Sequence, residues 1–385
     1  MNDAPEQIPV FDVRVTDDDL AEVEAALRSG WLTMGERTER FEREFAAAIG
    51  TEHCVAMSSC TAALHVACIA AGVGPGDEVI VPSMTFAATA NAVRYTGATP
   101  VFADVVSEGD LGIDVGHVES LIGERTKAVI PVHYAGYPVA IGELARICDE
   151  RGLFLIEDAA HAPSARMAPG GAKLGSIGDA GCFSFFPNKV LGVGEGGALT
   201  TDSAELAERA RQLRSQGMTA VSIDRHRGSA TGYDVRERGF NYRFDDPRAA
   251  LLISRFHRLE TELVARRKVV ARYRELLGDL DAITIPYSDF DLDCSSCYLM
   301  GVVAADAQTR RALRERLSEV HGVQTTMYPA VHLFTAYREA YGEISLPRTE
   351  RVADGLFSIP LFPHITAGQQ DRVAEGLRES IGAVA

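Results

Sequence analysis

The sequence has no long apolar run, no excess of positive charge and few cysteines. No stretch approaches the roughly 20 apolar residues of a membrane-spanning helix, and the N-terminus has no basic region followed by an apolar core. We therefore expect a cytoplasmic protein with no membrane contact. Lysine and arginine total 38 against 54 aspartate and glutamate residues, and the net charge of -16 would repel a nucleic-acid backbone. The composition favours a small-molecule partner and no nucleic acid.

The seven cysteines are too few and too scattered to form the disulfide framework of a small secreted domain. We expect most of them to be small apolar residues of the core. Cys294 and Cys297 have the CxxC spacing of a zinc site, but no second pair and no nearby histidine complete four ligands. The sequence therefore predicts no metal site.

The pattern of apolar runs predicts an α/β protein of two domains. From about residue 50 to 205, short apolar runs alternate with helix-like stretches, as in the crossover units of a mostly parallel sheet. Apolar residues then recur at helical spacing from Asp246 to Leu277, which predicts one long helix joining two domains. We expect a large α/β domain with an N-terminal arm over residues 1–250 and a small α+β domain over residues 251–385. The predicted strands are HCVAMSS, EVIVPS, TPVFADV, AVIPVH, LFLIED, GCFSFF and ALTTD.

Reactive side chains follow several of these strands. Ligands of α/β sheets bind at the carboxyl ends of strands, so residues at these positions are expected to meet. Asp158 ends LFLIED and is followed by His161, while GCFSFF leads to Lys189. Ser58 and Ser59 precede a helix whose free N–H groups would suit a phosphate, although such serines more often only cap a helix. Together the residues suggest a site that combines a carboxylate, an amine and an anion-binding helix end.

Lys189 and Asp158 both need special surroundings to act chemically. A lysine becomes nucleophilic when its pocket lowers its pKa from about 10.4. A buried Asp158 needs a partner such as a protonated pyridine nitrogen, which would accept electrons from a substrate carbanion. The run GVGEGG at residues 192–197 permits close backbone approach beside the lysine. It is not a dinucleotide fingerprint, because it leads into a strand instead of opening a helix.

Seven segments, in order along nearly the whole chain, resemble the DegT/DnrJ/EryC1/StrS family, the sugar-aminating branch of fold-type-I pyridoxal-phosphate enzymes. The resemblance implies a fold-type-I architecture, with a mostly parallel central sheet flanked by helices in the cofactor-binding domain and a smaller C-terminal α+β domain. The segments are SGWLTMG, SSCTAALHVA, GPGDEVIVPSMTFAATANAV, IEDAAHA, GCFSFFPNKVLGVGEGGALTT, RGFNYRFDD and TMYPAVHLFTAYRE.

The resemblance assigns roles around pyridoxal 5'-phosphate. Lys189 would carry the cofactor as a Schiff base, and Asp158 would pair with the pyridine nitrogen. His161 would lie near the phenolic oxygen of the ring, and Phe86 would support the face of the ring. These residues are typical of the whole family and leave the second substrate open.

The resemblance also implies a phosphate site shared between two subunits. The backbone at Cys60 and Thr61, together with Ser184, would hold the phosphate. Cys60 stands where the family usually has glycine, and we expect its backbone N–H to matter more than its sulfur. Asn241 would reach the phosphate in the partner subunit's site, so the family pattern implies a homodimer with shared active sites.

An aminotransferase reaction is expected because Lys189 is present, whereas relatives that dehydrate sugars have histidine at this position. L-Glutamate is the expected amino donor, the cofactor would pass through its pyridoxamine (PMP) form, and a ketone would receive the amino group. Lys189 would move the proton as a general acid/base, with ping-pong kinetics.

The acceptor is predicted from one position. His161 resembles members that aminate carbon 4 of a nucleotide-linked 4-keto-6-deoxyhexose in amino-sugar or natural-product biosynthesis. Amination at carbon 3 of a keto-sugar, amination of a cyclitol ketone and a non-catalytic protein that binds pyridoxal phosphate remain as alternatives. The planar guanidinium group of arginine matches the geometry of a diphosphate, so we expect an arginine contact on the substrate side. The substrate-side candidates are Trp31, Arg243, Tyr328 and His332.

Overall fold

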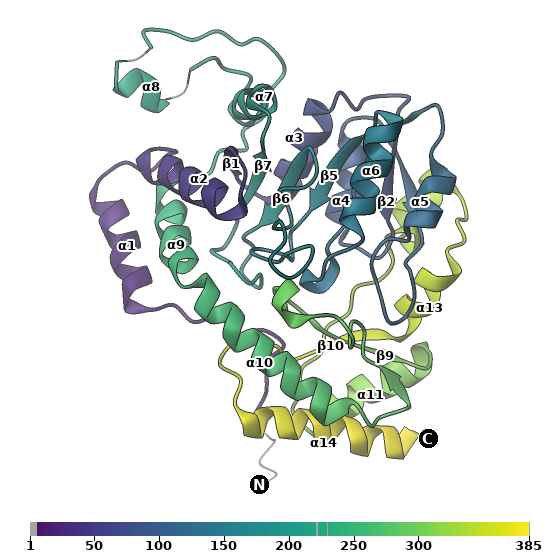
Figure 1. Cartoon of the computed structure of the whole chain (residues 1–385). Helices are drawn as coiled ribbons and strands as arrows, with labels where there is room; N and C mark the ends of the chain where they lie inside the picture. Colours follow the sequence, from purple (N-terminus) through teal and green to yellow (C-terminus); the bar gives the residue numbers. More distant parts are fainter. Residues whose placement is uncertain (1–5, 221, 229, 385) are drawn as a thin grey trace.

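A seven-stranded sheet forms the centre of the larger part of the molecule in the computed structural model, which describes residues 6–220, 222–228 and 230–384 (Figure 1). All seven predicted strands are present, and only β7 runs antiparallel to its neighbours. The mostly parallel α/β sheet predicted from the sequence is therefore confirmed. In spatial order the strands are β1 (His53–Met57), β7 (Gly197–Thr201), β6 (Ala180–Ser184), β5 (Phe154–Asp158), β4 (Thr126–Val129), β2 (Glu78–Pro82) and β3 (Thr99–Ala103).

Helices cover both faces of this sheet because alternate strand residues point to opposite sides. Ala56 and Ile80 belong to the hydrophobic cluster that includes α2, α5 and α6, whereas Val55 and Val79 belong to the cluster of α3, α4 and α7. Helix α3 is apolar over nearly all of its surface, as expected of a helix buried on all sides. The helices are α2 (Glu36–Ile49), α3 (Cys60–Ala70), α4 (Ala87–Tyr95), α5 (Val115–Leu121), α6 (Ile141–Arg151) and α7 (Ala204–Arg214).

The single long helix predicted from the periodicity is two helices, α9 (Asp246–His257) and α10 (Leu259–Leu277). The break lies at Arg258, whose backbone leaves the helical region at φ -105° and ψ 3°. Its guanidinium binds Asp19 of α1 (Asp17–Arg28) through two bonds of 2.6 Å. Apolar periodicity does not register this break because the buried stripe continues across it. Helix α9 spans the predicted domain boundary at residue 250, which stays a prediction.

A smaller antiparallel sheet lies below the large one in Figure 1, with α10, α11 and α14 beside it. Its strand order is β10-β9-β8. The N-terminal segment reaches this part of the chain, since Ile8 forms a parallel bridge with Val323. The elements are β8 (Ile283–Thr284), β9 (Met300–Ala304), β10 (Leu356–Ile359), α11 (Ala307–Glu319), α12 (Thr335–Tyr341), α13 (Pro347–Gly355) and α14 (Ala367–Val384).

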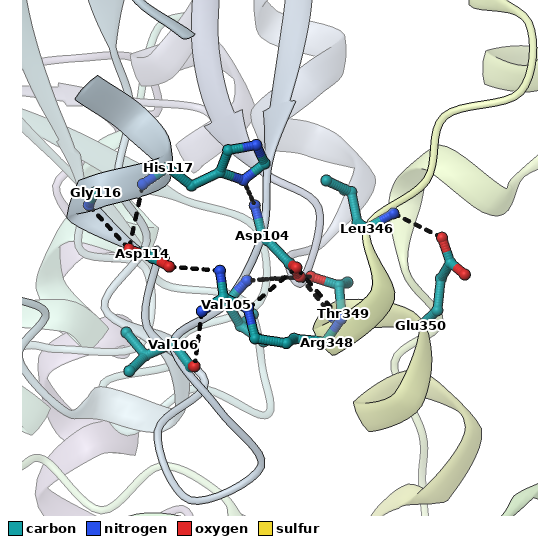
Figure 2. A network of polar contacts seen from close by, with 10 residues as sticks. All are labelled: Asp104, Val105, Val106, Asp114, Gly116, His117, Leu346, Arg348, Thr349 and Glu350. Carbon is teal, nitrogen blue, oxygen red and sulfur yellow. Dashed lines mark hydrogen bonds and ion pairs between the residues drawn. The ribbon is translucent and has the colours of Figure 1, made fainter. Parts of the chain in front are cut away.

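A polar network ties α13 to the end of β3 (Figure 2). The N-cap residue of α13, Leu346, has no capping side chain, and Asp104 accepts bonds from the first turn of the helix instead. The Asp104 carboxylate accepts bonds of 2.7 Å from both the backbone N–H and the hydroxyl of Thr349. Arg348 binds Asp104 and Asp114. These contacts fix the C-terminal part of the chain against the large sheet.

The remaining helical turns are short and connect the larger elements. Over the described ranges, no helix combines the length and the apolar character needed to cross a bilayer. The short turns are α8 (Ser222–His226), η1 (Tyr134–Gly136), η2 (Leu292–Cys294) and η3 (Val331–Leu333).

Candidate active site

A pocket of about 330 Å³ lies where the carboxyl ends of the parallel strands meet residues of the C-terminal part. Residues that follow β1, β2, β5 and β6 reach it because β1 and β6 both run antiparallel to β7 and therefore end at the same edge. The pocket brings together eight of the predicted site residues: Cys60, Thr61, Phe86, Asp158, His161, Ser184, Lys189 and Tyr328.

The Lys189 amine lies inside this pocket. Its Nζ is 4.4 Å from the ring centroid of Tyr298, and its backbone N–H donates to the carbonyl of Phe186 across a turn. Burial lowers the pKa of Lys189 to about 8, although the negative charge of Asp158 opposes this shift. A much larger fraction of this amine is therefore unprotonated near neutral pH than in a solvated lysine, as a nucleophile or base requires.

Asp158 ends β5 as a buried carboxylate. Thr89 Oγ1 donates to its Oδ2 over 2.8 Å, and the Ala160 N–H donates to its Oδ1 over 3.2 Å. Burial raises the pKa of Asp158, while the bonds from Thr89 and Ala160 and the charge of Lys189 oppose the rise. The hydroxyl of Thr89 lies 2.7 Å from the hydroxyl of Thr85, and Thr85 lines the pocket. This carboxylate has partners that favour its charged form.

His161 is held as a neutral imidazole. Its Nδ1 accepts a bond of 3.2 Å from the Ala135 N–H, so the proton lies on Nε2. Burial lowers the pKa of His161 well below its ordinary range, and the charge of Lys189 lowers it further. Ala135 adopts a positive φ of 57° within the η1 turn, which aims its N–H at the ring. His161 can therefore donate one hydrogen bond from Nε2.

The N-terminus of α3 offers backbone N–H groups to an anion. Ser59 caps the helix by accepting from the Ala62 N–H over 3.1 Å, and the amides of Cys60 and Thr61 precede the first intrahelical bond. Burial, with the charge of Asp158, raises the pKa of the Cys60 thiol well above its ordinary value, so the thiol stays neutral. The backbone N–H groups of Cys60 and Thr61 are thus better suited to an anion than the thiol.

Gly197 lets β7 approach this helix start. A Cβ at Gly197 would lie 2.3 Å from the Ser59 carbonyl carbon and 2.4 Å from the Cys60 nitrogen. Such distances are too short for any side chain. The glycine-rich run therefore packs the phosphate-binding candidate against the sheet, the close backbone approach that the sequence predicts.

Four predicted residues lie outside the pocket lined by the described residues. Exposed Asn241 pairs with the backbone of Ser215, and Arg243 bridges the backbone of Met57. Trp31 donates from Nε1 to the Met34 carbonyl over 3.1 Å. The fourth, buried His332, bonds through Nδ1 to Ser83 over 2.6 Å and lies 3.5 Å from Glu350. Its contacts within the chain are those of a packing residue.

Sequence reasoning missed three residues of the site. Thr89 contacts Asp158, and Tyr298 contacts Lys189. Asn188 lines the pocket, and its Oδ1 is buried with no hydrogen-bond partner among the described residues. Thr89 lies four residues after Thr85 at the start of α4, a helical spacing that could have revealed the hydroxyl pair. Tyr298 precedes an apolar run and carries no such signal.

Among the described residues, Cys294 and Cys297 have no further side chains beside them that would complete a metal site. Cys294 and Cys297 are buried and have free thiols. In the part of the chain that the structure describes, no group of three or more histidine, cysteine, aspartate or glutamate side chains could hold a metal ion.

The sequence matches one protein family over almost its whole length. The model of the DegT/DnrJ/EryC1/StrS aminotransferase family matches residues 14–378. The spore coat polysaccharide biosynthesis protein SpsC of Bacillus subtilis (strain 168) is 36% identical over 370 residues, which cover 94% of each chain.

Solved structures share the fold of the chain. The aminotransferase TlmJ from Streptoalloteichus hindustanus is 36% identical, with a TM-score of 0.90, and the match covers 99% of this chain and 100% of TlmJ. NtdA from Bacillus subtilis, solved with its bound cofactor PMP, is 29% identical, with a TM-score of 0.85 and coverage of 96% and 83%. The similarity extends through both sheets.

Proposed function

This chain belongs to the DegT/DnrJ/EryC1/StrS aminotransferase family, and we propose that it transfers an amino group from L-glutamate to carbon 4 of a nucleotide-linked 4-keto-6-deoxyhexose. It is a pyridoxal-phosphate-dependent sugar aminotransferase. The observation that carries the proposal is one pocket that holds the Lys189 amine, the Asp158 carboxylate and the open end of α3.

The residues of this pocket fit pyridoxal phosphate. The amides of Cys60 and Thr61, with the Ser184 hydroxyl, would hold the phosphate, and Asp158 would face the ring nitrogen. Lys189 would attach to the cofactor carbonyl, since its amine is buried with a lowered pKa. When bound, pyridoxal phosphate takes up the amino group and stabilises the negative charge that develops on the substrate carbon.

The side chains of the protein supply proton transfer and orientation. After release from the cofactor, Lys189 Nζ would take a proton from the substrate carbon and deliver it to the cofactor carbon to which the lysine had been attached. The bond from Thr89 favours the charged form of Asp158, and the neutral His161 can donate from Nε2. The buried ring of Tyr298 covers the amine on one side, and Phe86 also lines the pocket.

Two residues support the proposed acceptor and the proposed dimer. His161 occupies the position that we associate with carbon-4 amination. Asn241 is exposed and does not line the pocket of its own chain, which supports a role in the partner subunit's site. We therefore propose a homodimer in which each site uses residues of both subunits.

Spectroscopy and an acceptor panel test this function. Purified enzyme should show an absorbance band between roughly 300 and 500 nm that L-glutamate bleaches and a keto-acceptor restores. The panel should contain a nucleotide-linked 4-keto-6-deoxyhexose, a 3-keto-sugar and an inosose-type ketone without nucleotide. Turnover of only the last would overturn the nucleotide-sugar proposal, and a band that no amino acid bleaches would indicate a non-catalytic protein.

A further inference from the structure

The segment 294–298, which contains the CxxC pair, is hydrogen-bonded to the loop that orients His161. Ser296 Oγ donates to the His161 carbonyl, and the Ser296 N–H donates to the Gly136 carbonyl over 3.2 Å. The Tyr298 N–H donates to the Ala135 carbonyl over 2.9 Å, and the Ala135 N–H in turn donates to His161 Nδ1. Backbone and imidazole of His161 are thus both fixed through this segment.

The close packing of Ser296 against Gly136 restricts which residue can occupy position 136. A Cβ at Gly136 would lie 2.1 Å from Ser296 Oγ, and Gly136 has a positive φ of 89°. Only glycine fits a left-handed position with so little space. The two serines between Cys294 and Cys297 therefore serve this contact, which gives the CxxC spacing a structural role.

The ring of Tyr298, the last residue of this segment, lies beside the amine of Lys189. The ring is fully buried, and Lys189 Nζ lies 4.4 Å from its centroid. His161 lies 4.3 Å from the same centroid at 34°, and Phe11 of the N-terminal segment stacks at 5.9 Å and 14°. Its hydroxyl is 3.5 Å from the hydroxyl of Tyr328. One ring thus contacts both groups that the proposed chemistry uses.

We propose that Tyr298 is a positioning residue whose ring holds the Lys189 amine and the His161 imidazole in their working orientations. This inference rests on the proposed role of Lys189. An ammonium over an aromatic face is attracted by the ring quadrupole, and the attraction grows when the cation is desolvated. The ring therefore confines Nζ to one region of the pocket.

The contact with the Tyr298 ring also affects the pKa of Lys189. Burial favours the neutral amine, and the ring favours the ammonium, so the two effects oppose each other. Removing the ring should leave burial less opposed and lower the pKa of Lys189 further. The titratable groups that face the amine or line the same pocket are Cys60, Asp158, His161, Glu195, Tyr298 and Tyr328.

A matched pair of variants separates the ring from the hydroxyl. Tyr298→Phe keeps the aromatic face and removes the bond to Tyr328, whereas Tyr298→Met fills the space without a ring. In cofactor-free protein, competitive acetylation across pH reports the pKa of Lys189 by mass spectrometry. The chain has only four lysines, and exposed Lys127 and Lys268 serve as internal standards.

The expected results differ between the two variants. Tyr298→Met should lower the pKa of Lys189 by about one unit, and Tyr298→Phe should leave it near the wild-type value. In the loaded enzyme, kcat of Tyr298→Met should fall on the order of tenfold with little change in KM for L-glutamate. Equal labelling profiles in all three proteins would overturn the inference.

Two further measurements keep the test decisive. If Tyr298→Met does not fold, the Tyr298→Phe protein carrying one, two or three ring fluorines weakens the quadrupole at constant shape. The pKa of Lys189 should then fall with each fluorine, and a flat series would refute the contact.

Borohydride reduction followed by peptide mapping tests Lys189 itself. Cofactor trapped elsewhere would overturn the proposed function, whereas attachment at Lys189 with an unchanged titration would overturn only the role of Tyr298.

Discussion

Thr89 Oγ1 donates a hydrogen bond of 2.8 Å to Asp158 Oδ2, from a helix on one side of the pocket to a strand end on the other. Burial alone raises the pKa of Asp158, and this bond is the largest effect that opposes the rise. A carboxylate must stay charged to keep a pyridine nitrogen protonated. Thr89 would therefore support the cofactor chemistry through Asp158, although it does not itself line the pocket.

Thr89→Val should weaken cofactor binding and make it more dependent on pH. Loss of a buried bond to a carboxylate costs about 2 kcal/mol, or roughly thirtyfold in affinity. Because Thr89 lowers the pKa of Asp158, the variant should protonate Asp158 at a higher pH, and affinity should fall first on the acid side. Titration of cofactor-free protein with pyridoxal phosphate at several pH values measures this. Thr89→Ser keeps the hydroxyl and should bind nearly as wild type; equal weakening in both variants would point to packing.

Lys189→Ala should abolish amino transfer, because Lys189 is proposed both to attach the cofactor and to move the proton. Loss of general acid/base catalysis alone lowers rates by about a hundredfold to ten-thousandfold. Single-turnover kinetics with L-glutamate provide the measurement. Lys127→Ala, at an exposed position of β4, is the matched control and should keep full activity. Residual activity of Lys189→Ala above one-tenth of wild type would contradict the assignment.

The Asp104 network in Figure 2 should stabilise the folded chain. Asp104→Asn loses the charge that Thr349 and Arg348 bond to, and the free energy of unfolding should fall by about 2 kcal/mol. Burial raises the pKa of Asp104, but these bonds lower it below its ordinary value, so the stability is present above pH 4 and is lost as pH falls below about 4. Urea unfolding at neutral and acid pH measures both effects. Glu108→Gln, which loses a half-exposed ion pair with Arg351, should change stability by less than about 1 kcal/mol.

The sequence predicted the large sheet because each buried strand is a short apolar run between helical stretches. The same pattern singled out Asp158 and Lys189, since Asp158 ends one such run and Lys189 lies three residues after another. Tyr298 could not be found this way: it reaches the pocket from a segment more than 100 residues after Lys189 in the chain, and only the packing of the two sheets brings them together. His332 shows the reverse, because this histidine follows Tyr328 closely in the sequence but bonds to Ser83 and does not line the pocket.

The break between α9 and α10 has a similar explanation. It depends on the contact between Arg258 and Asp19, two residues far apart in the sequence. Periodicity records which face of a helix is buried and is blind to a change of direction that preserves that face. Contacts of this kind decide helix ends and site residues alike.

Mixing two inactive variants tests whether active sites are shared between subunits. Asn241 lies outside the pocket of its own chain, so we expect Asn241→Ala to weaken phosphate binding in the partner's site and to be inactive alone at low pyridoxal-phosphate concentration. Co-expression of Lys189→Ala with Asn241→Ala would give mixed dimers in which one of the two sites has both an intact lysine and an intact asparagine. With random pairing, about a quarter of the wild-type activity should return, because half of the dimers are mixed and each has one complete site. If each site used Lys189 and Asn241 of one chain, the mixture would instead give only the average of the two variants. The exposure of Asn241, and its absence from the pocket lining of its own chain, favour the shared arrangement.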